Sequence, residues 1–269
     1  MSNIIQTILS YGFLSRALIA GLLISVCASL LGVTLVLKRY SMIGDGLSHI
    51  SFGALAFASV MGMAPLKLAI PVVAIAAIAL LRLGGKKIKG DSLIAIISSS
   101  ALALGIMLIS YSGTSADMNS YLIGSLYAVS KSDMMSAVVL CVIAIGVFTF
   151  LYNRIFTVTF DEDFSKATGV RVGFYNTIIA VLISITVVIG MRLMGSLLIS
   201  ALIVFPALSS MRVFKSFKAV TISSAIISIV SFLAGFCLTL FLDGIPTGAC
   251  ITIVNLIIFI VLSAIEMIR

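Results

Sequence analysis

An aspartate and the only histidine of the chain, Asp45 and His49, lie four residues apart in a segment that is otherwise largely apolar. A helix advances about 100° per residue, so both side chains fall on one face, one turn apart. An ionisable side chain inside a transmembrane helix costs about 2.5 to 3.5 kcal/mol on the insertion scale, and such residues usually mark an ion or substrate path. Carboxylate oxygen and imidazole nitrogen also suit a divalent transition metal. The pair therefore predicts a metal site inside a membrane.

Two other roles remain open for this segment. Asp45 could cap the start of its helix, although a cap leaves His49, one turn deeper, without a purpose. The small residues around the pair either let helices pack closely or line a narrow ion path: Gly44, Gly46, Ser48, Ser51 and Gly53.

Asp45 and His49 alone are too few ligands for a divalent ion, which takes about four or more. A symmetric homodimer with its twofold axis along the pore would supply two aspartates and two histidines, so the pair predicts a second copy of the chain as partner. The ion would be cargo, and no permanently bound cofactor is expected. The sequence has no GxxxxGK[ST] phosphate-binding motif and no hydrolase triad, so we do not expect an enzyme. Energy for uphill transport would come from elsewhere.

The composition predicts an all-α integral membrane protein. The 269 residues are 61% hydrophobic and 10% charged, with a mean hydropathy of +1.30. Apolar runs of about 20 residues, not short alternating strands, predict a polytopic helical bundle in membrane lipid. The net charge of +8 is spread in short clusters between these runs, so nucleic acid is not expected as a partner. The four cysteines show no CxxC spacing and are expected to be buried and free, and the N-terminus lacks a cleavable signal.

Nine apolar runs are candidate membrane spans: 17–37, 43–63, 66–81, 92–111, 134–152, 174–191, 195–211, 219–242 and 249–265. The third and seventh are short and contain Pro71 and Pro206, so either could be broken or re-entrant, which would leave eight crossings. With the N-terminus outside and the C-terminus inside, 13 of the 17 basic residues fall in cytoplasmic segments. This bias supports that orientation.

Two connecting segments are longer than turns. Residues 112–133 are expected outside, as an interfacial loop or a short helix lying on the bundle. On the cytoplasmic side, a helix is expected from about Asp161 to Thr168, because three acidic residues favour its N-terminus and Gly169 suits its end. A two-turn helix is not stable alone in water, so further contacts must hold it.

Five strings resemble the membrane subunit of zinc and manganese ABC-type importers, in the order and spacing of that family and over nearly the whole chain: LKRYSMIGDGLSHISFG (37–53), YLIGSLYAVSKSDM (121–134), FDEDFSKATGV (160–170), GSLLISALIVFPALSSM (195–211) and DGIPTGACI (243–251). The resemblance implies a type II ABC importer permease fold, homodimeric, with residues 1–269 as one transmembrane permease domain of eight or nine spans. It also implies that Asp45 and His49 bind zinc, manganese or iron in transit.

The same resemblance assigns a coupling segment at about 155–173, which docks on the nucleotide-binding subunits. Its contact residues would be Asp161, Glu162, Asp163, Phe164, Ala167, Thr168 and Gly169. The implied partners are a second copy of the chain, two cytoplasmic ABC ATPase subunits, and an extracellular or periplasmic metal-binding protein. The implied location is the bacterial cytoplasmic membrane.

Two other classes compete with this interpretation. An ion-gradient-driven secondary metal transporter would usually carry inverted repeats and more acidic residues within the membrane than this chain has. A membrane enzyme or structural subunit would need a second catalytic group, which the sequence does not offer. A neighbouring gene for an ATPase would separate the first alternative from an ABC importer.

Overall fold

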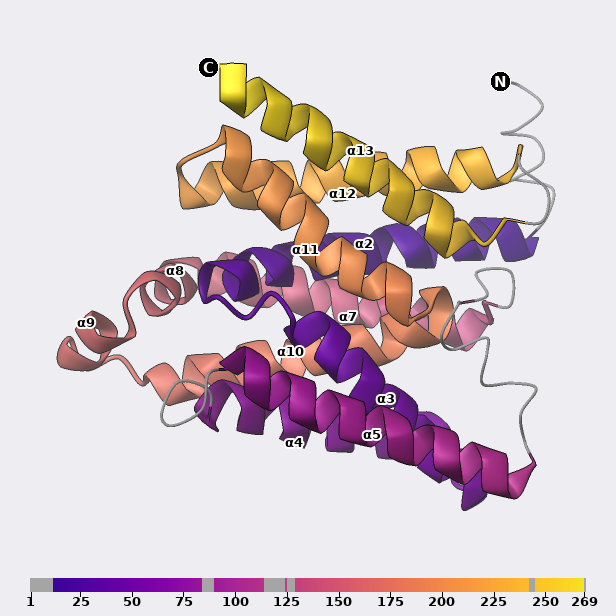
Figure 1. The fold of residues 1–269 in the computed structure, drawn as a ribbon. Coiled ribbons are helices and arrows are strands. Elements are labelled where there is room, and N and C mark those ends of the chain that lie inside the picture. Colours follow the sequence, from indigo (N-terminus) through magenta and orange to yellow (C-terminus); the bar gives the residue numbers. More distant parts are fainter. Residues whose placement is uncertain (1–11, 84–89, 114–123, 125–128, 242–244, 269) are drawn as a thin grey trace.

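The computed structural model describes residues 12–83, 90–113, 124, 129–241 and 245–268, and all of their regular structure is helical. Nine long helices correspond one to one with the nine apolar runs (Figure 1): α2 (Gly12–Leu37), α3 (Ile43–Val60), α4 (Pro65–Leu83), α5 (Gly90–Ser112), α7 (Lys131–Phe150), α10 (Val172–Met194), α11 (Ser196–Val213), α12 (Phe217–Thr239) and α13 (Thr247–Ile268). Two short helices, α8 (Tyr152–Phe160) and α9 (Glu162–Ala167), stand between α7 and α10.

Eight of the long helices are long and apolar enough to cross a membrane, and α3 is the exception. Its 18 residues include Asp45, His49 and several small polar residues, which lower its hydropathy. The helix that carries the candidate metal ligands is therefore the least membrane-like of the nine described. Pro71 and Pro206 lie inside continuous helices, α4 and α11, so the alternative of broken segments at these positions is wrong. The segment expected as an external loop, 112–133, lies largely outside the described residues.

Small residues allow the central helices to pack closely. A Cβ atom on Gly32 of α2 would lie 2.0 Å from the backbone oxygen of Ile203 in α11, so only glycine permits this approach. Between α2 and α12, the hydroxyl of Ser228 donates to the backbone oxygen of Ser25 at 2.8 Å. Among the eight candidate spans, α2 and α10 are the most buried, and α4, α5 and α13 are the most exposed.

The helices run back and forth, so their ends gather at two ends of the bundle (Figure 1). One end holds the α2–α3 turn, the α11–α12 turn, the projecting α8–α9 segment and the end of α13. In the orientation that the charge pattern predicts, these connections would face the cytoplasm. Helix α2 starts at the opposite end, as an odd number of crossings requires. The four cysteines are free, and three of them, Cys27, Cys141 and Cys250, are buried, as expected.

Candidate functional site

Helix α3 places Asp45 and His49 together. Their side chains face each other across one turn, with His49 Nε2 3.4 Å from Asp45 Oδ2. The helix begins after Met42, and no side chain caps it. Asp45 lies in the first turn and turns toward His49, so the capping alternative is wrong. The expected geometric pairing is confirmed.

Asp45 and His49 do not fully satisfy each other's hydrogen-bonding groups. A separation of 3.4 Å is long for an N–H···O bond, whose usual range ends near 3.2 Å. The Asp45 side chain is 49% exposed and that of His49 is 25% exposed. The Nδ1 atom of His49 is buried and has no hydrogen-bond partner among the described residues. Both side chains therefore keep lone pairs that a ligand could use.

Beside the pair, α3 and α5 enclose a cavity of about 280 Å³. Asp45 and His49 line it from α3, and Asp91, Ser98 and Ser99 line it from α5. Asp91 lies in the first turn of α5 and is exposed. Within the described part of the chain, no three His, Cys, Asp or Glu side chains converge closely enough to hold a metal ion. A single copy thus brings two candidate metal ligands together, fewer than a divalent ion commonly takes.

The glycines around the pair serve packing. A Cβ on Gly46 would lie 2.4 Å from Cγ2 of Ile94, and one on Gly53 would lie 2.6 Å from the backbone oxygen of Ala101. Both neighbours belong to α5, so these glycines hold the metal-ligand helix tightly against it. The Ser48 hydroxyl donates to the backbone oxygen of Gly44 within α3. These contacts support the packing role over the lining of an ion path.

The short helix that the sequence predicts from about Asp161 to Thr168 is present as α9. The Asp161 side chain accepts a hydrogen bond from the backbone N–H of Phe164 at 2.8 Å and so caps α9. At the other end Gly169 has φ +79°, and the N–H of Val170 donates to the oxygen of Ser165 at 2.9 Å. This is the glycine-terminated helix end that the sequence predicts. The helix is confirmed, and its docking role remains a prediction.

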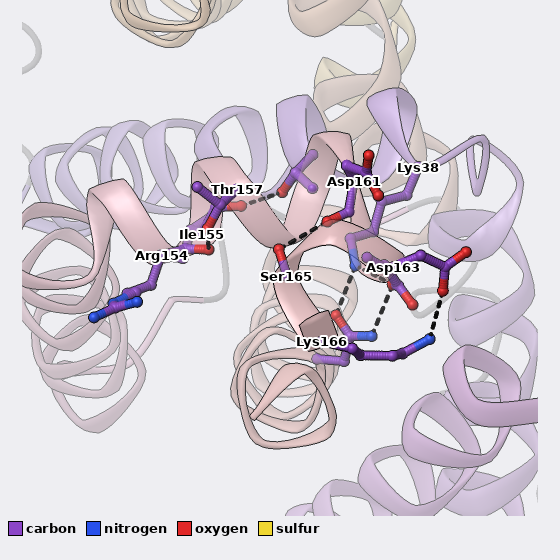
Figure 2. A network of polar contacts seen from close by, with 11 residues as sticks. Lys38, Arg154, Ile155, Thr157, Asp161, Asp163, Ser165 and Lys166 are labelled. Carbon is purple, nitrogen blue, oxygen red and sulfur yellow. Dashed lines mark hydrogen bonds and ion pairs between the residues drawn. The ribbon is translucent and has the colours of Figure 1, made fainter. Parts of the chain in front are cut away.

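The residues assigned to ATPase coupling divide between two directions. Six of them are exposed at the surface of the α9 turn: Asp161, Asp163, Phe164, Ala167, Thr168 and Gly169. Phe164 is 60% exposed although it is apolar. Glu162 is instead half-buried, and its carboxylate contacts Lys38, which follows the end of α2. Figure 2 shows Lys38 beside the α9 turn. The structure therefore separates six exposed residues from one carboxylate that is paired with the bundle.

Sequence reasoning missed the partners of Glu162. In the sequence, Lys38 is one of the many basic residues between apolar runs, and Asn176 carries no signal of a role. The Lys38 side chain is only 7% exposed, and its Nζ lies 2.7 Å from Oε1 of Glu162. Burial lowers the pKa of Lys38, against the pull of the neighbouring carboxylate. Burial also opposes ionisation of Glu162, but the bonds from Lys38 and Asn176 outweigh it and hold the Glu162 pKa below its usual range.

An aromatic cluster anchors the segment that leads into α9. Phe156 and Phe160 of α8 lie 5.4 Å and 6.0 Å, centroid to centroid, from the ring of Phe217 at the start of α12. Tyr152 contacts the same ring at 5.4 Å. Such ring pairs contribute about 0.5 to 1.5 kcal/mol each beyond burial. Helix α8 is therefore fixed to the bundle, and it positions the α9 turn beyond it.

Known proteins resemble the chain over nearly its full length. The manganese import system permease protein ScaB of Streptococcus gordonii is 30% identical over 97% of this chain and 94% of its own length. The manganese transport system membrane protein MntC of Listeria innocua is 26% identical, covering 96% and 92%. Among solved structures, PsaBC from Streptococcus pneumoniae matches with a TM-score of 0.86 and 27% identity, covering 97% of this chain and 94% of that one.

These likenesses agree with the fold and with the strings that the sequence carries. The model of the ABC 3 transport family matches residues 10–266, which is almost the entire chain. The chain therefore belongs to the ABC 3 transport family and is a membrane subunit of a metal-ion ABC transporter.

Proposed function

We propose that two copies of this chain form the translocation path for a divalent transition-metal ion, with Asp45 and His49 of each copy as its ligands. The main support for this proposal is that α3 presents two candidate metal ligands, fewer than a transition metal needs. A carboxylate and an imidazole lie 3.4 Å apart beside a cavity, and no third ligand group converges on them in the described residues. Two such half-sites related by a twofold axis supply four ligands, the number that a transition metal commonly takes.

Manganese is the cargo we favour, because the names of the relatives in Streptococcus gordonii and Listeria innocua are those of manganese transport proteins. Ligand chemistry alone does not select it. Carboxylate and imidazole also bind zinc and iron, and zinc binds more tightly than manganese in the general order of affinities. Zinc and iron are therefore the competing cargoes that a transport assay must separate.

Two cytoplasmic ATPase subunits would supply the energy by docking on the outward face of α9. The exposed Phe164 ring and the acidic residues beside it support this assignment, since an exposed aromatic side chain commonly anchors a protein interface. An extracellular or periplasmic metal-binding protein would deliver the ion at the opposite end. Residues 1–269 would then form one permease domain in the bacterial cytoplasmic membrane, with 155–173 as its coupling segment.

Transport by the purified complex tests the proposal. The chain is reconstituted into liposomes with its ATPase subunits and its metal-binding protein, and uptake of radioactive manganese is measured with and without ATP. Excess zinc or iron is added as a competitor. We expect manganese uptake that depends on ATP and on the binding protein. Equal uptake without the ATPase subunits, driven by an ion gradient, would instead identify a secondary transporter.

A further inference from the structure

Three side chains from three separate elements meet at the cytoplasmic end of the bundle. The Nζ of Lys38, just after α2, donates to Oε1 of Glu162 in α9 at 2.7 Å and to Oδ1 of Asn176 in α10 at 2.6 Å. The amide nitrogen of Asn176 donates to the same Glu162 oxygen at 3.0 Å. Every pair in this triangle is hydrogen-bonded, and Figure 2 shows Lys38 reaching from the end of α2 to the α9 turn.

The triangle is closed and specific. The ammonium donates to both partners, and the amide of Asn176 uses its oxygen toward the cation and its nitrogen toward the carboxylate. A buried lysine must be paired, since an isolated charge away from water is strongly unfavourable. Because the Lys38 side chain is only 7% exposed, loss of both partners would leave its ammonium group buried and unpaired unless the side chain moved. Displacement of α9 must therefore either carry Lys38 along or break the triangle.

The backbone from Lys38 to the metal-ligand helix is short and stiff. Arg39 has φ +63°, a left-handed conformation that costs a non-glycine residue free energy. It is held by the N–H of Arg39 donating to the oxygen of Val36 and the N–H of Tyr40 donating to the oxygen of Leu35. The N–H of Ile43 then donates to the oxygen of Tyr40 at 3.1 Å, which starts α3.

This connection leaves little slack between the triangle and the metal ligands. Asp45 follows Lys38 by only seven residues, and it already belongs to the first turn of α3. Strained backbone that the surroundings hold in place is typical of switch regions. A shift at Lys38 is thus passed to the start of α3 and is not absorbed by a flexible loop.

We propose that Lys38, Glu162 and Asn176 form a polar clamp that transmits movement of α9 to the helix carrying Asp45 and His49. The inference rests on the proposed function, in which α9 docks on an ATPase subunit and α3 carries the metal ligands. The three residues act as positioning residues: they touch neither the metal nor the nucleotide. Through the clamp, α9 and the start of α3 would move together in each copy of the chain.

A purely structural anchor would behave differently. If the triangle only held α9 in place, its loss would reduce binding of the ATPase subunits, and hydrolysis and transport would fall together. A transmitting clamp predicts that the subunits still bind and hydrolyse ATP, while fewer ions cross per ATP. The ratio of ions transported to ATP hydrolysed is therefore the decisive quantity.

The test uses the full complex in liposomes, with manganese and its binding protein. Lys38→Met removes the charge and keeps most of the side-chain length. We expect ATP hydrolysis to persist while transport per ATP falls by about fivefold or more, the lower range of coupling between distant sites. Lys38→Arg, which retains a cation, should recover part of the loss. Glu266→Gln is the matched control, because it breaks another cytoplasmic-end ion pair, to Arg212, at 3.1 Å.

Glu162→Gln guards against a variant that does not assemble, since it keeps the shape and one acceptor oxygen. Lower transport per ATP in Lys38→Met supports the clamp. Where Lys38→Met does not assemble, Glu162→Gln decides: lower transport per ATP supports the clamp and normal coupling overturns it. Normal coupling in an assembled Lys38→Met complex overturns it. Failure of both variants to retain the ATPase subunits also overturns it, because the triangle would then be an anchor.

A further measurement separates this inference from the proposed metal path. Met42, which precedes α3, is 54% exposed and lines the cavity beside Asp45. In a background without the four native cysteines, Met42→Cys should change its rate of thiol labelling when nucleotide is added, and Lys38→Met should abolish that change. This readout needs no metal. If manganese does not pass but the labelling change follows Lys38, the cargo assignment fails and the clamp stands; an unaltered change in Lys38→Met means the clamp fails.

Discussion

Two sets of polar residues, linked by the short segment between Lys38 and Asp45, differ in how completely their hydrogen bonds are satisfied. The Lys38–Glu162–Asn176 clamp is closed, with separations of 2.6 to 3.0 Å and the lysine almost fully buried. The Asp45–His49 pair is open, at 3.4 Å, with one imidazole nitrogen lacking a partner in the described part of the chain. The side chains of the first set satisfy one another, whereas those of the second have hydrogen-bonding capacity left for a ligand.

This difference predicts that the clamp contributes to the stability of the fold, whereas the open pair contributes mainly to metal binding. Breaking a fully buried ion pair costs about 3 to 5 kcal/mol. The clamp is worth less than that figure, because Glu162 is 42% exposed and remains partly solvated when Lys38 is lost. Asp45, half exposed and loosely paired, contributes little to folding by the same reasoning. Substitutions at the open pair should therefore impair transport while leaving the fold intact.

The largest expected effect comes from removing the open pair. Asp45→Ala with His49→Ala deletes every proposed metal ligand from both copies, and we expect manganese uptake to fall by about 100-fold or more, beyond the effect of outer-shell changes at metal sites. Co-purification with the ATPase subunits should be unchanged. Uptake by the reconstituted double variant is the measurement, and a normal rate would exclude these residues from the path.

Ser99→Ala is the matched control for that experiment. Ser99 lines the same cavity, but its hydroxyl donates only to backbone oxygens of its own helix, at 2.7 Å and 3.3 Å. The substitution should leave uptake within about twofold of the original rate, since a surface change of this kind usually costs less than about 0.5 kcal/mol. A severe loss would show that the cavity wall itself binds the ion.

A smaller effect is expected at the proposed docking face of α9. Phe164→Ala removes an exposed ring, and we expect affinity for the ATPase subunit to weaken by about 2 kcal/mol, or roughly 30-fold, as for an interface anchor. Phe241→Ala is the control, because Phe241 is 68% exposed at the opposite end of the bundle. Binding of purified ATPase to the detergent-solubilised chain distinguishes them. Equal affinities for the two variants would argue against docking at α9.

The next effect concerns the end of α9. Gly169→Val puts a β-branched residue at φ +79°, and we expect a cost of about 1 to 2 kcal/mol in the stability of this turn. Transport should fall several-fold. Gly173→Val adds the same side chain near the start of α10, where the backbone is not left-handed and a Cβ meets nothing within 4 Å. If both variants transport equally well, the left-handed turn is not needed for coupling.

How much of this could be predicted from the sequence depended on the range of the interactions. Apolar runs predicted the long helices, and the local signals of Asp161 and Gly169 predicted both ends of α9, because caps and stops involve neighbouring residues. The pairing of Asp45 with His49 followed from helical spacing in the same way. Alternatives that needed the surroundings, such as a broken helix at Pro206, were settled only by the structure.

The clamp could not have been predicted, because its members are far apart in sequence. Lys38 and Glu162 are separated by 124 positions, and no periodic pattern links them. Lys38 also looked like an ordinary charge of a cytoplasmic turn, which is usually solvated. Its burial against α10 depends on how several helices pack, which cannot be predicted from the composition of the chain. Glu162 likewise resembled its neighbours Asp161 and Asp163 until its direction was known.

The last prediction concerns orientation and not transport: it tests which side of the membrane the clamp faces. The coupling role requires the clamp and α9 to lie in the cytoplasm, and the bias of basic residues supports this orientation. Met63 and Lys215 are exposed at opposite ends of the bundle, Met63 before α4 and Lys215 before α12. In a background without native cysteines, a membrane-impermeant thiol reagent on intact cells should label Met63→Cys but not Lys215→Cys. The reverse pattern would put α9 outside the cell, where no ATP-hydrolysing subunit could reach it, and the clamp would lose its proposed driver.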